Sequence, residues 1–135
     1  MEYNNKIPIK SEFYPLYTTT QWNDRLQLNP EELERAIYNS YYVVSVYENK
    51  QLIGFGRVVS DGVAYATIYD VMVSPSWQNQ GIGSKIIRKL VDKCERHDIR
   101  RIYLFAAKNA ENYFKRLGFV ARPSSSRGMS YEKIG

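Results

Sequence analysis

A strand, a loop with two glycines and an amphipathic helix follow one another between residues 71 and 96. The apolar strand ends at Ser74-Pro75, and Gly81 and Gly83 stand where the helix begins. Beyond them, apolar side chains recur at helical spacing and basic ones fill the opposite face. A short buried strand, Arg101 to Ala106, comes next. The succession predicts a strand–helix–strand crossover that joins two parallel strands.

Three strand patterns stand before this crossover. Residues 42–47, 52–59 and 64–73 are rich in β-branched and aromatic side chains. Asn49-Lys50 and Asp61-Gly62 separate them, and both dipeptides are typical of hairpin turns. These patterns predict an antiparallel meander, which with the crossover makes a mixed α/β or α+β layer.

Helices are expected before and after the strands. The aromatic segment from Phe13 to Trp22 mixes helical and loop signals, and Asn29-Pro30 marks the start of a helix that runs to about Asn39. Another helix is expected before Gly118, which stands in the position of a C-terminal cap. Its apolar face is made by Ala110, Tyr113, Phe114 and Leu117. Residues 119–121 and 129–133 predict a final strand pair. With no linker or repeat, residues 1–135 are expected to form one domain.

The charge of the chain is divided unevenly. Residues 1–80 hold six Lys/Arg against nine Asp/Glu, whereas residues 81–135 hold thirteen against five. A basic half indicates an anionic ligand, either nucleic acid or a small polyphosphate, and the scatter of the charges favours the small ligand. A solvated basic face with no ligand is the alternative. One cysteine, Cys94, and one histidine, His97, exclude an intramolecular disulfide and a Cys/His zinc cage.

The two-glycine loop predicts where an anion would bind. The first turn of a helix leaves backbone N–H groups without intrahelical partners, and glycines let a phosphate approach the backbone closely. The alternative is tight packing of helix on strand. The loop lacks the G-x-x-x-x-G-K-[ST] pattern of nucleotide hydrolases and the three-glycine dinucleotide fingerprint. ATP and NAD are therefore unfavoured.

The segment Gln78-Asn79-Gln80-Gly81-Ile82-Gly83 resembles the Q/R-x-x-G-x-G/A signature of the GNAT superfamily of acetyl-CoA-dependent N-acetyltransferases. Leu117-Gly118-Phe119 is similar to a late element of the same family. The resemblance extends over about residues 40–121, and several short segments, such as Tyr69-Asp70-Val71, resemble the branch that contains plant and cyanobacterial serotonin N-acetyltransferases.

The resemblance implies a GNAT fold: a mixed central sheet with an antiparallel meander, a βαβ cofactor unit, and helices on both faces. It also implies acetyl-CoA as cosubstrate and no metal. Backbone groups of Val71 and Val73 would pair with the pantetheine arm, and backbone amides from Gln78 to Ser84 would hold the pyrophosphate. Lys85, Arg88 and Lys89 are available for the outer phosphates. The expected cofactor-binding residues are Val71, Met72, Val73, Gln78, Asn79, Gln80, Gly81, Ile82, Gly83 and Ser84.

The expected catalytic residues are Asp70, Tyr69 and Tyr113. Asp70 is an acid inside an apolar strand that leads to the loop, so it is the leading candidate for the base; the alternative is a structural partner for Arg57. The backbone N–H of Val73 is the natural donor to a developing oxyanion. Many family members carry a tyrosine at the position of Phe114, which has no proton to donate. Either water or another of the twelve tyrosines therefore protonates the leaving sulfur, or the reaction proceeds without acid assistance. Tyr113 is adjacent, but one residue along a helix turns the side chain by about 100°.

The sequence thus predicts acetyl transfer to a primary amine, expected to belong to a small molecule, by direct attack in a ternary complex. A CoA-binding module without turnover is the alternative. We expect no nucleic-acid or membrane partner, and a cytoplasmic location, since the polar start does not resemble a secretory signal. The sequence leaves the oligomeric state open, and the resemblance makes a homodimer one alternative.

Overall fold

A computed structural model describes residues 1–132, in two compact units, 1–105 and the segment from Ala106 onward. The elements of the first unit are β1 (Glu2–Asn4), α1 (Lys10–Thr18), α2 (Asn23–Leu26), α3 (Pro30–Tyr38), β2 (Tyr42–Glu48), β3 (Gln51–Ser60), β4 (Tyr65–Val73), the 3-10 turn η1 (Pro75–Trp77), α4 (Ile82–Arg96) and β5 (Arg101–Leu104). Those of the second are α5 (Glu111–Arg116) and the 3-10 turn η2 (Ser124–Ser126). No helix within residues 1–132 is long and apolar enough to cross a membrane.

The five strands form one sheet in the order β1-β2-β3-β4-β5. β1 to β4 pair antiparallel, and β5 lies parallel to β4 after the crossover through α4. The meander and the parallel crossover predicted from the sequence are therefore confirmed. The edge strand β1 was not predicted, because three residues are too few to show an alternating pattern.

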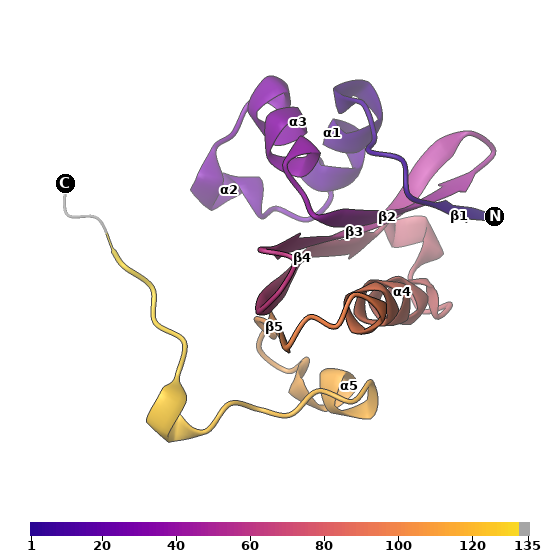
Figure 1. Ribbon diagram of the computed structural model, residues 1–135. Helices are drawn as coiled ribbons and strands as arrows, with labels where there is room; N and C mark the ends of the chain where they lie inside the picture. Colours follow the sequence, from indigo (N-terminus) through magenta and orange to yellow (C-terminus); the bar gives the residue numbers. More distant parts are fainter. Residues whose placement is uncertain (133–135) are drawn as a thin grey trace. The chain divides into compact units, whose positions relative to one another are not determined.

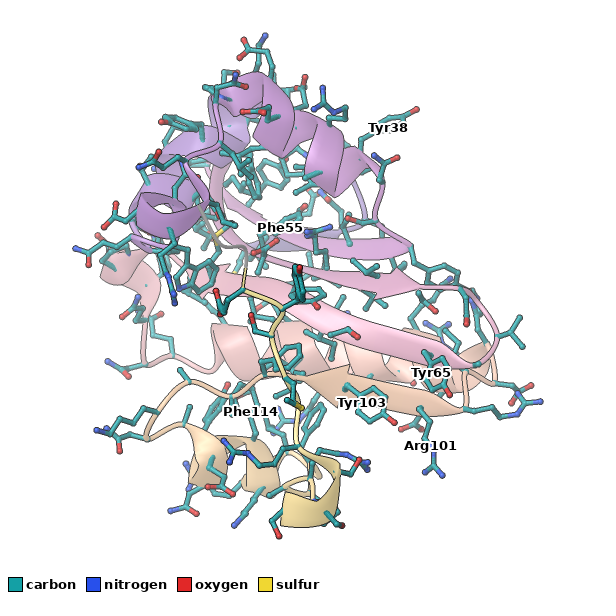
Figure 2. The ribbon with its side chains drawn as sticks, turned by 90° about the vertical axis from the view of Figure 1, so that its left-hand side faces the viewer. Tyr38, Phe55, Tyr65, Arg101, Tyr103 and Phe114 are labelled. Carbon is teal, nitrogen blue, oxygen red and sulfur yellow. The ribbon has the colours of Figure 1, made fainter. Side chains whose placement is uncertain are left out.

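Helices cover both faces of the sheet, as expected: α1 to α3 lie on one side and α4 on the other (Figure 1). A cluster of buried side chains fills the space between the sheet and α1 and α3, with Phe13, Tyr17 and Phe55 at its centre. Phe55 points from β3 into this layer (Figure 2). The opposite layer is built from the apolar stripe of α4, of which Ile86, Leu90 and Cys94 are fully buried.

Two helix starts follow from local chemistry. Asn29 caps α3: its side chain accepts a hydrogen bond from the Glu32 amide at 2.8 Å, and Glu32 accepts one from the Asn29 amide at 2.9 Å. This reciprocal pair is a capping box, which satisfies two amides that lie ahead of the helical bonds. Gly81 precedes α4 with a φ of +81°, a left-handed conformation that favours glycine. The chain therefore turns sharply from the loop into α4.

The second unit corrects one prediction. α5 and the positive φ of Gly118, +99°, agree with the expected helix and its stop. The final strand pair is absent from residues 119–132, which form only the turn η2; Lys133 lies outside the described residues. Pro123 has no amide to donate to a sheet, and the apolar side chains Val120, Met129 and Tyr131 are at least 86% exposed. Short segments with no face to bury do not form strands.

Candidate acetyl-transfer site

The centre of the site is an irregularity where β3 meets β4. Phe55 pairs with Met72 and Arg57 with Tyr69, so two residues of β4, Asp70 and Val71, face the single residue Gly56. Such a β-bulge shifts the residues beyond it onto changed faces of the sheet. Asp70 has a φ of +57°, the only left-handed backbone within a described strand. Tyr69 and Asp70, adjacent in sequence, therefore do not alternate as a regular strand requires.

Close packing explains why Asp70 turns away from α4. A methyl group on Gly56 would lie 2.6 Å from Cγ2 of Ile86 and 3.0 Å from Cδ1 of Leu90, so α4 sits directly on this part of the sheet. The Val71 side chain occupies the same layer, 3.3 Å from that point. A carboxylate directed into this layer would be buried among apolar atoms at high cost. The bulge sends Val71 there instead.

On the other face Asp70 meets Arg57. Arg57 Nε donates to Asp70 Oδ2 at 2.7 Å, and the two side chains are only 17% and 21% exposed. The same guanidinium donates from Nη1 to the Ala36 carbonyl at 3.3 Å and to Ser40 Oγ at 3.4 Å. The sequence offered an Arg57 partner as the alternative role for Asp70. The structure shows that partnership, while a catalytic role for Asp70 stays a prediction.

Aromatic rings lie around this ion pair. The Arg57 guanidinium is 5.9 Å from the centre of the Tyr69 ring, which lies 6.3 Å from the ring of Phe105. Tyr17 of α1 contacts Trp22 edge to face at 6.2 Å. Burial and the nearby charge of Asp70 raise the pKa of Tyr17, while Arg57 opposes the shift, so the Tyr17 hydroxyl is within electrostatic reach of the pair. Aromatic rings from α1 and β4 thus lie near the charged pair.

The edge of β4 that faces β5 is open beyond the ion pair. β5 pairs with β4 only from Tyr65 to Ile68, whereas β3 follows β4 as far as Val73. The paired part carries the stacked rings of Tyr65 and Tyr103, 6.4 Å apart (Figure 2). Residues 69–73 therefore present a strand edge that β5 leaves uncovered. An extended ligand of about 15 Å can lie along five such residues.

Val73 directs its polar backbone groups toward that open edge. The Ser74 amide donates to the Ile53 carbonyl at 2.7 Å, and bonding in an antiparallel pair alternates from one residue to the next. The amide and carbonyl of Val73 therefore point away from β3. Its carbonyl accepts a hydrogen bond from Gln78 Nε2 at 3.0 Å. Met72 points the other way: its backbone turns toward β3 and its side chain is 4% exposed in the core.

The loop brings the start of α4 to the end of this edge. Asn79 and Gly81 both adopt positive φ, 64° and 81°, which lets the chain turn back within a few residues. The helical bonds begin with the Lys85 amide and the Gly81 carbonyl at 3.1 Å, so the amides of Ile82 and Gly83 lie ahead of them. No acidic residue stands in the first turn. Amides at a helix N-terminus with no nearby carboxylate attract an anion.

These features fit acetyl-CoA. A pantetheine arm could bond along residues 69–73 as an added strand, and the loop amides could hold the pyrophosphate. A methyl group on Gly81 would find no atom within 4 Å, so the backbone there faces open space. Bound acetyl-CoA supplies an acetyl thioester, an electrophile that a neutral amine can attack. The expected cofactor residues stay predictions. The described geometry accommodates them except Met72, whose backbone turns toward β3 and whose side chain is buried in the core.

Other candidate residues have different surroundings. Lys85 Nζ and Lys89 Nζ lie 4.2 Å and 5.7 Å from the centre of the Tyr3 ring, so β1 holds the two lysines that were expected to be available for phosphates. His97 Nδ1 bonds the Tyr41 hydroxyl at the end of α4. Cys94 is fully buried, and burial raises the pKa of its thiol, as expected of a packing residue.

The second unit holds the remaining catalytic candidate. Tyr113 lies on α5 with its ring 5.2 Å from that of Phe114, and Phe114 packs edge to face on Phe119 at 6.0 Å. Phe114 is therefore one of three aromatic rings packed within this unit. Among residues 1–132, no three His, Cys, Asp or Glu side chains gather as a metal-ion set.

The sequence comparisons agree with this geometry. Residues 8–119 match the model of the acetyltransferase (GNAT) family, which is most of the chain and includes β4, the loop and α4. The chain belongs to the GNAT family. The resemblance inferred from Gln78 to Gly83 is thus confirmed, and GNAT membership implies the use of acetyl-CoA.

Individual relatives are informative about the branch. A protein named histone acetyltransferase TAP1 from Glycine max is 38% identical over 109 residues, covering 73% of this chain and 47% of the relative. Serotonin N-acetyltransferase 2, chloroplastic, from rice (Oryza sativa subsp. japonica) is 33% identical over 79 residues, covering 58% and 40%. The chain spans about half the length of the curated relatives it matches. A solved probable acetyltransferase from Staphylococcus aureus superposes with a TM-score of 0.80 at 25% identity, covering 98% of both chains.

Sequence reasoning missed the contacts of Arg57 with Ala36 and Ser40. Arg57 and Asp70 stand on neighbouring strands with opposite charge, a signal that was visible in the sequence. The link to the end of α3 depends on how helix and sheet pack, for which the sequence holds no local pattern. Tyr3 was missed for the same reason, because nothing in the sequence places β1 beside α4.

Proposed function

We propose that this GNAT protein transfers the acetyl group of acetyl-CoA to a primary amine of a small molecule. The single observation that carries the proposal is the open edge of β4, which runs from the loop at the start of α4 to the half-buried carboxylate of Asp70. The loop would hold the pyrophosphate, the edge would hold the pantetheine arm, and the carboxylate would meet the acceptor amine beyond the thioester.

The residues of the chain have distinct tasks in this proposal. The amide of Val73 points toward the open edge and is positioned to donate a hydrogen bond to the oxygen that gains negative charge. Asp70 binds the acceptor nitrogen and receives its proton, directly or through a water molecule. At pH 7 only about one alkylamine in a thousand is neutral, so a group that removes or accepts this proton matters for the rate.

The aromatic rings near the ion pair support an acceptor that is small and partly apolar. Tyr69 lies beside Arg57, the charge of Asp70 acts on Tyr17, and Trp22 packs edge to face on Tyr17. These rings are available to contact an organic amine that binds Asp70. One relative is named for serotonin and another for histones, so the names of the relatives include both small and protein acceptors. The aromatic rings beside the charged pair favour the small molecule.

A thiol-release assay with acetyl-CoA and a panel of primary amines tests the proposal. Wild-type protein should release CoA with at least one small amine, and D70N should lower kcat at least tenfold while binding acetyl-CoA normally. Phe114, in place of the tyrosine that many family members use as an acid, favours a second candidate, a CoA-binding module without turnover. If the protein binds acetyl-CoA but releases no thiol with small amines or lysine peptides, the result contradicts the proposed enzyme and supports the CoA-binding module.

A further inference from the structure

Asp70 adopts an unfavourable backbone conformation in the middle of a strand. A left-handed φ costs a non-glycine residue about 1–2 kcal/mol, and a half-buried carboxylate adds a desolvation cost. Such strain persists only where the surroundings over-determine it. Two contacts could do so: the apolar layer under α4, which excludes the carboxylate, and Arg57, which attracts it.

Arg57 is the side chain that connects Asp70 to the rest of the site. It stands on β3 and bonds Asp70 on β4. It also reaches the last turn of α3 through Ala36 and the short loop after α3 through Ser40. A guanidinium presents donors in a fixed planar fork, so bonds to the backbone of α3 fix the direction in which Nε points. The orientation of the Asp70 carboxylate therefore depends on where α3 ends.

We infer that Arg57 is a positioning residue for acetyl transfer: anchored on the end of α3, it holds Asp70 in the bulge and aims its carboxylate at the acceptor amine. The inference rests on the proposed function, in which Asp70 binds that amine. Arg57 itself is not required to touch the substrate. Without it, Asp70 would keep a buried charge with no partner and would lose the contact that fixes its direction.

The test uses R57M, R57K, D70N and the double variant R57M/D70N. Turnover is measured with the amine that wild-type protein acetylates best, at a temperature where urea unfolding shows each variant more than about 95% folded. Acetyl-CoA affinity is measured by calorimetry. R96M is the matched control, because Arg96 also bonds an aspartate, Asp92, but on the exposed end of α4.

We expect R57M to lower kcat at least tenfold and to change acetyl-CoA affinity less than threefold. R57K should lie between R57M and wild type, because one ammonium cannot bond Asp70, Ala36 and Ser40 together. In the D70N background, R57M should change kcat less than twofold, since Arg57 acts through Asp70. R96M should match wild type.

Wild-type kcat in folded R57M overturns the inference. A loss of kcat from R57M that is equal in the wild-type and D70N backgrounds also overturns it. If R57M does not fold, wild-type kcat in R57K overturns it. All three results leave the proposed function standing. Wild-type protein that acetylates no amine overturns the proposed function and this inference together.

Discussion

The side-chain amide of Gln78 donates a hydrogen bond to the carbonyl of Val73, 3.0 Å away, and so joins the end of β4 to the loop before α4. Gln78 opens the GNAT signature, and Val73 is the last residue of the open strand edge. The bond closes the turn between the part of the site expected to hold the pantetheine arm and the part expected to hold the pyrophosphate. It fixes one relative to the other before any ligand arrives.

Replacing Gln78 by alanine should weaken acetyl-CoA binding about threefold to tenfold, because a hydrogen bond that orders the loop contributes about 1 kcal/mol. The free energy of unfolding should change by less than about 0.5 kcal/mol, since Gln78 is exposed. Calorimetric titration with acetyl-CoA and urea unfolding measure the two effects. Q51A, another exposed glutamine at the start of β3, is the control. Unchanged affinity in Q78A would show that the bond does not organise the site.

Gly81 and Gly62 have the same backbone conformation, so one serves as a control for the other. Both have a φ of +81°, and a methyl group at either meets nothing closer than 3.4 Å. G81A and G62A should therefore lose similar stability, about 1–2 kcal/mol, from left-handed strain alone. Only G81A should weaken acetyl-CoA binding, by at least tenfold, because the added methyl projects where the pyrophosphate is expected. Equal affinity in the two variants would contradict the placement of the pyrophosphate at this loop.

Gly56 is required for the approach of α4 to the sheet. In G56A the new methyl group would lie 2.6 Å from Ile86, which forces α4 or the bulge to shift and should cost about 1–3 kcal/mol in unfolding free energy. At Gly54 the nearest atom is 3.2 Å away, at the tip of Ile86, so G54A should cost less. Urea unfolding of both variants measures the difference. An order of stability opposite to this one would mean that close packing does not set the bulge.

Tyr47 makes the stability of the protein sensitive to alkaline pH. Burial, followed by the hydrogen bond to Glu12 at 3.1 Å, raises the pKa of Tyr47 to about 12 from an ordinary value of 10. The unfolded chain therefore releases this proton at lower pH than the folded protein. Its contribution to stability is complete below pH 10 and is lost as pH rises toward 12.

Urea unfolding between pH 7 and 11.5 should show that loss, and Y47F should make the decline with pH shallower while costing about 1 kcal/mol at pH 7. Tyr3 and Tyr17 also have pKa values raised by burial, so part of the decline should remain. Y131F, at a 92% exposed position, is the control and should leave the profile unchanged. A Y47F profile identical to wild type would show that Tyr47 does not cause the decline.

The helices and strands of residues 29–105 could be predicted because each carries its own local signal. The capping pair of Asn29 and Glu32, the turn at Asp61-Gly62 and the stripe of α4 act within a few residues of chain. The predicted strands after Gly118 are absent because these short segments have no buried face and no partner strand within residues 119–132. The edge strand β1 was missed for the opposite reason: pairing with β2 makes it a strand, although its own sequence carries no strand pattern.

By itself, the sequence determined the crossover, the loop and the family. Two glycines before an amphipathic helix are a local pattern, and they constrain the backbone without help from tertiary contacts. Only the tertiary structure decided which way Asp70 faces. Regular alternation counted from Tyr69 would send it toward α4, but the close approach of Ile86 and Leu90 to Gly56 closes that layer. Arg57, anchored on α3, offers a charge on the other side. The direction of one carboxylate thus depends on the packing of two helices on opposite faces of the sheet, and no local pattern in the sequence records such packing.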